Sequence, residues 1–322
     1  MASAAFERGI SDVLAMRKAI YSEGDASRSD LEKLIALGPQ AGSDPAFRHL
    51  IAEVAEDVFV QQVDPEGYVG EADAAWLIAR LSEGGGLSCP AEFAILTSVL
   101  SHAVEAPASL SAFAVREIEK AILTGRRDAL GGADHEPGIV TAEDVEALRL
   151  VAFAPTRGNS LHVSKATAEA LFDIAHATAT AANAPEFADF FAKAVGNYLM
   201  GVAFIGTPER SEVLAHEAEL VKPTGFGAFF SALMRGPSSA DVADALESTE
   251  AKEEDADFRR NIETESRLDA AEKIDAGVAQ WIVAHLTRGG ELTEAEKRLL
   301  TFLRDEATSA PPEIVALYDK AA

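Results

Sequence analysis

The sequence predicts an all-α protein made of tandem three-helix units, about four copies, packed as a double helical bundle or a short curved array. Three observations support this fold class. Apolar residues recur at spacings of three and four, alanine is abundant, and a helix–glycine turn–helix motif occurs more than once. The apolar spacing is that of one face of an α-helix, and alanine is the residue that favours a helix most.

The two clearest copies of the motif are WLIARLSEGGGLSCP at 76–90 and WIVAHLTRGGELTEA at 281–295, 205 residues apart. Seven positions are identical without a gap: Trp76, Ala79, Leu81, Gly84, Gly85, Leu87 and Pro107 match Trp281, Ala284, Leu286, Gly289, Gly290, Leu292 and Pro312. Glycine can take the left-handed backbone that ends a helix, and Ser88 or Thr293 can then cap the next helix. The motif therefore predicts a chain reversal rather than a chemical site.

Two weaker copies complete the predicted array. The segment 13–35 is followed by a proline and an aromatic residue in 44–60, and the segment 138–174 is followed by the same pattern in 184–201. Each unit is expected to contain an apolar helix, a turn, a capped helix, a linker marked by proline and a third helix.

This pattern divides the chain into four parts. Units 1 and 2 are expected in 1–133, unit 3 in 134–221, an insertion in 222–263 and unit 4 in 264–322. The insertion begins with an apolar stretch flanked by glycine and proline, which contains Phe226, Phe229, Phe230, Leu233 and Met234. Two interpretations stay open for it: a strap that packs over the bundle, or an element that docks a partner protein. The acidic stretch 247–267 is expected to be a solvated helix or a linker.

Composition excludes several classes of partner and of site. The 53 acidic and 28 basic residues give a formal net charge of −25, which repels a phosphate backbone and disfavours nucleic-acid binding. Cys89 is the only cysteine, so an internal disulfide and a cysteine-rich zinc site are excluded. The N-terminus has no secretory pattern, which predicts a cytoplasmic protein. The longest apolar run, 194–206, is shorter than the roughly 20 residues of a membrane span.

Sequence motifs for catalysis are missing, since the chain has no phosphate-binding glycine loop, no HExxH motif and no GxSxG motif. His102 and Glu105, three residues apart, have the spacing of two metal ligands on one helix, although such pairs of residues are more often solvated. The loop QVDPEGYVGEAD at 62–73 can be aligned with a calcium loop, with Asp64, Glu66 and Asp73 near ligand positions. A structural corner made by a glycine and a valine is the alternative reading of this loop and of 133–144.

The segment RGGELTEAEKRLLTFL at 288–303 resembles the TerB-like helical family of tellurite-resistance proteins. Gly290, Leu292, Thr293 and Glu296 match the family's turn between two helices, and Gly289 stands where the family has an acidic residue. The first unit keeps acids at both places, Glu23 and Asp30. The resemblance implies an all-α bundle and acidic turns associated with a divalent metal.

Together these observations favour a non-enzymatic interaction scaffold or adaptor that binds another protein. The alternative is a divalent-metal-binding stress-response protein that uses its acidic turns, with Asp64, Glu66 and Asp73 as ligands. No cofactor is expected other than a divalent cation in this second case.

Overall fold

The computed structural model describes residues 12–152, 163–200, 276–307 and 310–319, and within these ranges the protein is all-helical and contains no strand. The α-helices are α2 (Val13–Ile20), α3 (Arg28–Ala41), α4 (Pro45–Glu56), α5 (Glu71–Leu81), α6 (Pro90–His102), α7 (Ala108–Thr124), α8 (Ala142–Ala152), α9 (Lys165–Ala177), α10 (Glu186–Met200), α14 (Ala276–Leu286), α15 (Glu294–Glu306) and α16 (Pro312–Tyr318). Three short turns accompany them: η1 (Tyr21–Glu23), the π-helical η2 (Asp57–Gln61) and η3 (Asp128–Leu130). The all-α prediction is thereby confirmed.

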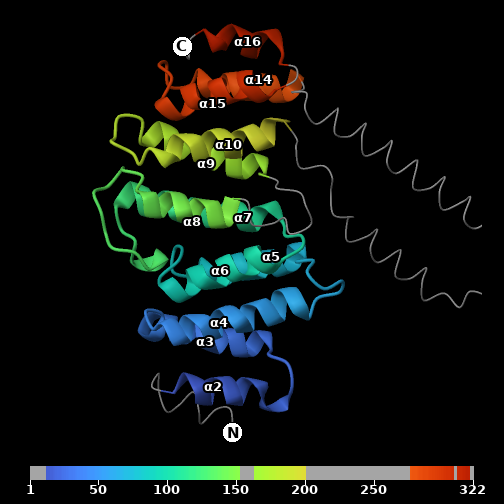
Figure 1. Ribbon diagram of the computed structural model, residues 1–322. Helices are drawn as coiled ribbons and strands as arrows, with labels where there is room; N and C mark the ends of the chain where they lie inside the picture. The colour runs from blue at the N-terminus through green and yellow to red at the C-terminus, as the bar shows by residue number, and fades with distance from the viewer. Residues whose placement is uncertain (1–11, 153–162, 201–275, 308–309, 320–322) are drawn as a thin grey trace, which may run out of the picture.

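The helices form a stack of layers (Figure 1). Helix α2 lies at the N-terminal end, α16 lies at the C-terminal end, and the other helices follow one another between them in chain order. Helix α4 packs on α6, α7 packs on α8 and α9, and α10 packs on α15. The layers before residue 201 and after residue 275 are therefore in direct contact.

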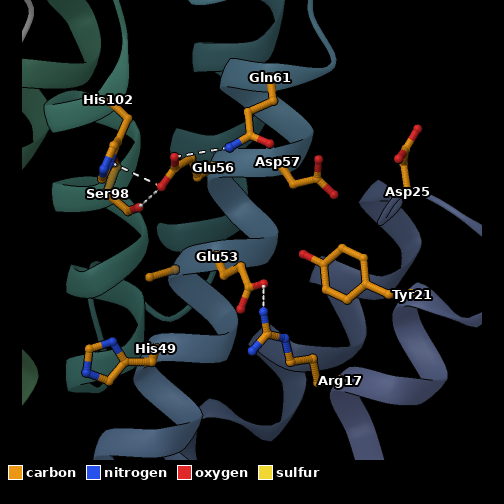
Figure 2. A pocket seen from close by; sticks show the side chains of 11 residues that line it. Arg17, Tyr21, Asp25, His49, Glu53, Glu56, Asp57, Gln61, Ser98 and His102 are labelled. Atoms are coloured by element: carbon orange, nitrogen blue, oxygen red, sulfur yellow. Dashed lines mark hydrogen bonds and ion pairs between the residues drawn. The ribbon is translucent and has the colours of Figure 1, made fainter.

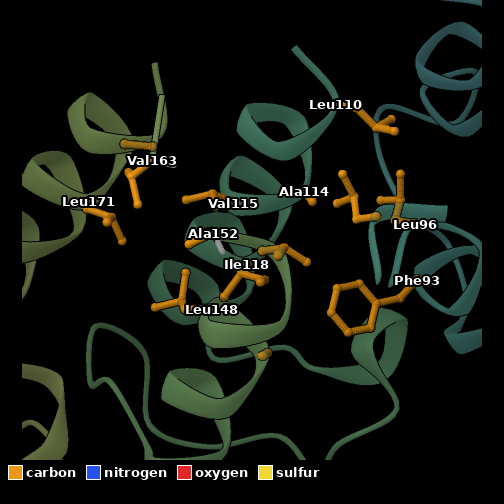
Figure 3. Packing of buried hydrophobic residues seen from close by; sticks show 14 of the residues in the cluster. Phe93, Leu96, Leu110, Ala114, Val115, Ile118, Leu148, Ala152, Val163 and Leu171 are labelled. Carbon is orange, nitrogen blue, oxygen red and sulfur yellow. The ribbon is translucent and has the colours of Figure 1, made fainter. Parts of the chain in front are cut away.

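A single hydrophobic cluster runs through all these layers, from Met16 in α2 to Leu317 in α16. Figure 3 shows its middle part, where Leu96 of α6, Ile118 of α7 and Leu148 of α8 meet in one interface. Each is fully buried, and burying a leucine or isoleucine side chain contributes about 1.5–3 kcal/mol. Since every layer contributes buried residues to this one cluster, the core is continuous rather than divided.

The repeated glycine turns have the expected backbone. Gly85 and Gly290 have φ angles of 87° and 83°, which is the left-handed region. Thr293 caps α15 with a complete capping box, in which Glu296 bonds back to the Thr293 N–H. The capping prediction for Ser88 was wrong, because Pro90 opens α6 and makes Cys89 the cap residue, which shifts Ser88 one position out of the helix.

Candidate functional site

A pocket of about 700 Å³ opens between α2, α4 and α6 in the N-terminal layers of the stack (Figure 2). It is lined by Arg17, Tyr21, Asp25, His49, Ala52, Glu53, Glu56, Asp57, Gln61, Ser98 and His102. The carboxylates outnumber the single guanidinium, so the formal charge of the lining is negative even before the histidines are considered. We take this α2–α4–α6 pocket as the candidate site because its polar groups converge on one concave surface.

The amphipathic pattern of α4 places the acids in this pocket. The apolar residues of the helix are buried in the core: Phe47, Leu50, Ile51 and Val54. Glu53, Glu56 and Asp57 follow one another at spacings of three and one, so Glu53 lies three and four residues before the other two on the same helix face. Helix α4 therefore packs on the core with one side, and α4 and the turn η2 that continues it supply three carboxylates to the pocket.

Two of these carboxylates already have side-chain partners. Glu53 accepts a hydrogen bond from the Arg17 guanidinium at 2.6 Å, and both side chains stay partly exposed. Glu56 accepts from the Gln61 amide at 3.2 Å and lies 3.2 Å from Nδ1 of His102. Figure 2 shows both networks on the wall of the pocket. A guanidinium and an imidazole thus already contact the acidic wall.

Nδ1 of His102 is the ring atom that faces the acidic wall of the pocket. It lies 2.9 Å from the backbone oxygen of Ser98 and 3.2 Å from the Glu56 carboxylate, and both are acceptors. The sequence had paired His102 with Glu105 as two metal ligands, but the structure directs this face of the ring to Glu56 on α4.

Asp57 is the most enclosed acid of the pocket. It opens the π-helical turn η2 at the end of α4, and π-helical turns are frequent at functional sites. Its side chain is 9% exposed, and one carboxylate oxygen accepts the Ala26 N–H at 3.0 Å. Within the described ranges, no other hydrogen bond to the Asp57 carboxylate is formed. The second oxygen therefore keeps its capacity to accept.

Tyr21 reports the electrostatic character of the pocket. Burial and, after it, the negative charges of Glu53 and Asp57 together raise the pKa of the Tyr21 hydroxyl to about 12, against the opposing charge of Arg17. Burial disfavours any charge, whereas the contribution of the two carboxylates comes from a negative potential at the hydroxyl. This second contribution agrees with the excess of carboxylates in the lining of the pocket.

This site was missed at the level of sequence, although a signal for it exists. The stretch EVAED at 53–57 places three acids on one turn of a helix whose other face is apolar. That pattern is typical of any solvated helix face, and the contribution of Arg17, Tyr21 and His102 comes from other helices. Their convergence depends on packing between layers.

The three residues predicted as metal ligands do not form a common site in the structure. Asp64 and Glu66 are exposed in the loop before α5. Asp73 lies in the first turn of α5 and forms an ion pair with Arg28 of α3. No group of three His, Cys, Asp or Glu side chains in the described ranges is arranged to hold a metal ion. Metal binding by these residues stays a prediction.

The structural alternative for the two glycine–valine loops agrees with what the structure shows. Val69 and Val140 are buried, and each follows by two residues a glycine with positive φ. The Val69 N–H donates to the Glu105 backbone oxygen, and the Val140 N–H donates to the Asn183 side chain, each at 2.9 Å. Each loop is thus tied to the segment that precedes the third helix of its own predicted unit.

The predicted partner-binding residues Phe226, Phe229, Phe230, Leu233 and Met234 lie outside the described residues, as does the whole insertion 222–263. Comparisons of the chain with protein-family models, with curated proteins and with solved structures find no match. In the described part of the chain, no helix combines the length and the apolar character that crossing a membrane requires.

Proposed function

We propose that the protein is a non-enzymatic interaction scaffold built from four tandem three-helix units. The units comprise α2 to α4, α5 to α7, α8 to α10, and α14 to α16. Stacked helical units produce long, repetitive surfaces, and proteins of this kind bind other proteins along those surfaces. The elongated stack with chain-order contacts supports this function (Figure 1).

One hydrogen bond that recurs in three units is the observation that carries the proposal. In each, the backbone N–H of the apolar residue before the second helix donates to a side chain of the third helix or of the turn that continues it. The acceptor lies just after α4 in the first case, in the middle of α7 in the second and in the last turn of α10 in the third. The pairs are Ala26 with Asp57 at 3.0 Å, Leu87 with Glu117 at 2.8 Å, and Val163 with Asn197 at 2.9 Å. We call this bond the unit tie. Because it joins the start of the second helix to the third helix in each case, the unit tie supports a shared construction of the units.

The starts of the third helices support the same division. Pro45 is the first residue of α4, Pro107 is the residue before α7, and Pro312 is the first residue of α16. Pro185 directly precedes α10. Proline suits a helix start because its missing N–H would have no partner there. Proline at the start of four third helices favours an array of units over an irregular bundle.

The unit tie can be tested by removing its acceptor in each unit separately. The variants Asp57→Ala, Glu117→Ala and Asn197→Ala should each lower the free energy of unfolding by about 1 kcal/mol, since each leaves a backbone N–H without its acceptor. Urea unfolding measures the three values. Similar losses support a repeated unit, whereas a loss confined to one variant contradicts it.

The scaffold function requires a partner that binds with fixed stoichiometry. The full chain is used to isolate binding proteins, each candidate is then purified, and the complex is measured by sedimentation equilibrium at physiological salt. A stoichiometric complex that survives this salt supports the proposal. A matched variant with serine in place of Phe226, Phe229, Phe230 and Met234 should keep its Tm and lose the complex if the insertion docks the partner.

The metal-binding alternative has its own test. Chelator-stripped protein is unfolded by heat with and without calcium, magnesium, manganese or zinc. A ligand of the native state at about 100 times its Kd adds roughly 2.7 kcal/mol of stability. A stabilisation that the double variant Asp64→Ala/Glu66→Ala abolishes would favour the alternative, and an unchanged Tm with every cation would contradict it.

A further inference from the structure

We propose that the α2–α4–α6 pocket binds one arginine side chain of a partner protein, with Asp57 as the carboxylate that receives the guanidinium. This inference rests on the scaffold function and names the chemistry by which a partner would be recognised. The pocket is open to solvent and has a volume of about 700 Å³, which accommodates a long side chain and part of the backbone that carries it.

Asp57 gives the pocket its anchor. Asp57 is 9% exposed, and one of its oxygens is held in place by the Ala26 N–H. The other oxygen receives no hydrogen bond from the described residues, and Asp57 lines the pocket, so this carboxylate can accept a cationic donor that enters it. Figure 2 shows the Asp57 side chain on the wall between the Glu56 network and the residues Tyr21 and Asp25.

The geometry favours a guanidinium over a compact ammonium group. Arg17 already presents a guanidinium to Glu53 at 2.6 Å on the same wall, so the pocket holds a planar cation of this kind in its own structure. A second guanidinium at Asp57 can donate through its fork to the free oxygen and to the exposed carboxylate of Asp25. The aromatic ring of Tyr21 beside them adds a face on which a planar cation can stack.

The net charge of the whole chain makes a specificity control essential. With a formal charge of −25, the protein attracts basic peptides over much of its surface. The probe is therefore a peptide with a single arginine, acetyl-Gly-Arg-Gly-amide, and the salt concentration is about 0.15 M, at which charges more than about 8 Å apart are largely screened.

The experiment compares wild-type protein with Asp57→Asn and Glu117→Gln by NMR chemical-shift titration, which measures millimolar Kd values. Glu117 is the matched control, because it forms the same unit tie through the Leu87 N–H and lies outside the α2–α4–α6 pocket. Each substitution removes one negative charge and keeps an amide oxygen that can accept the tie. We expect a saturable 1:1 titration, a Kd at least about tenfold higher in Asp57→Asn, and a change below about twofold in Glu117→Gln.

Other results would overturn the proposal. Equal weakening in both variants would show attraction by net charge alone, and the absence of saturation would show that no site exists. Equal affinity for acetyl-Gly-Lys-Gly-amide would overturn the assignment to a guanidinium. If Asp57→Asn does not fold, Asp25→Asn replaces it, because Asp25 is exposed, and it should raise the Kd about threefold.

The outcome is separable from that of the scaffold test. A purified partner complex that forms while the arginine peptide fails to bind would refute the pocket and leave the scaffold function standing. Peptide binding without any stoichiometric partner complex would support the pocket and contradict the scaffold function.

Discussion

Trp76 and Trp281 occupy the same position in the two copies of the glycine-turn motif, yet the structure surrounds them differently. Two guanidinium groups lie over the Trp76 ring, Arg28 at 5.6 Å and Arg80 at 5.7 Å from the ring centroid, and one other ring, Phe59, lies 5.5 Å away. The Trp281 ring contacts three other rings: His285 at 4.3 Å, Tyr198 at 5.0 Å and Phe172 at 5.7 Å between centroids. One motif is therefore used in a mainly charged setting and in an aromatic setting.

The comparison separates what the motif specifies from what its neighbours specify. Arg80 and His285 follow their tryptophans by four residues, and each lies against the tryptophan ring one helical turn away. Both tryptophans are partly buried at the edge of the core. The motif thus specifies the turn and the position of the ring. The residues that pack on the ring differ between the copies, and they come both from the same helix and from neighbouring helices.

The largest expected effect comes from the aromatic setting. Trp281→Ala should lower the free energy of unfolding by about 3 kcal/mol, because it removes a large side chain and its contacts with Phe172 and Tyr198. Trp76→Ala should cost about 1 kcal/mol less, since this ring has one aromatic neighbour, Phe59, and its other ring contacts are with partly exposed arginines. Urea unfolding of the two variants measures the difference. Equal losses would break the comparison and place both rings in equivalent surroundings.

The second effect concerns the acids that close the two turns. Glu296 is almost fully buried, bonds back to the Thr293 N–H at 2.7 Å and lies 2.9 Å from Nε2 of His176. Glu296→Ala should cost about 2 kcal/mol, because it removes the cap and leaves a partly buried imidazole without this acceptor. The position that matches Glu296 in the other copy is Ala91, and Glu92 takes over by accepting the Ser88 N–H.

Glu92→Ala is therefore the matched variant, with an expected loss of about 1 kcal/mol. A double-mutant cycle between His176 and Glu296 isolates their interaction, and we expect a coupling of at least about 0.5 kcal/mol. Zero coupling, or a larger loss in Glu92→Ala than in Glu296→Ala, would contradict the assignment of Glu296 as the stronger turn closure.

The third effect should be equal in the two copies. A Cβ atom added to Gly85 or Gly290 meets nothing within 4 Å, so only the left-handed backbone opposes a side chain. Gly85→Ala and Gly290→Ala should each cost about 1 kcal/mol. Gly84→Ala is the control with a smaller expected loss, because its backbone is not left-handed and its nearest contact would lie at 3.9 Å. Unequal losses for Gly85 and Gly290 would show that the turns differ in more than their neighbours.

The all-α fold and the glycine turns could be predicted from sequence because they depend on local patterns. Apolar spacing specifies which face of a helix is buried, and Gly85 and Gly290 specify where the chain reverses. The Ser88 cap was wrong because Pro90 favours the first helical position and moves the helix start by one residue. The preference of serine for the cap position and of proline for the first helical position compete here, and the sequence alone does not show which one decides the helix start.

The α2–α4–α6 pocket could not be predicted in the same way. Glu53 and Asp57 are visible on one helix face, but Arg17 is 36 residues before Glu53, and Tyr21 precedes Asp57 by a similar distance. Their meeting depends on how α2 and α4 pack, which no local pattern encodes. For the same reason the acidic loop with Asp73 looked like a metal site in the sequence, while the structure pairs this residue with Arg28 from another helix.

The smallest expected effect tests the charged setting directly. Arg80 lies over Trp76 and also bonds Glu32 at 2.8 Å, and the arginine and Glu32 side chains are about two-fifths exposed. Exposed ion pairs contribute little, and the stacking of a solvated cation adds only a modest amount. Arg80→Met keeps the aliphatic length and removes the charge, so its Tm should fall by about 1 °C or less.

The salt dependence of the Arg80→Met effect decides between the two settings. At 1 M NaCl, where the Debye length is about 3 Å, the Tm difference between wild type and Arg80→Met should shrink, because the lost contacts are electrostatic. His285→Met in the other copy should lower the Tm more and by the same amount at both salt concentrations, since it removes a ring packed 4.3 Å from Trp281. Identical salt responses in the two variants would mean that the residues packed on Trp76 and on Trp281 are equivalent. The distinction between a charged and an aromatic environment of the two tryptophans would then be wrong.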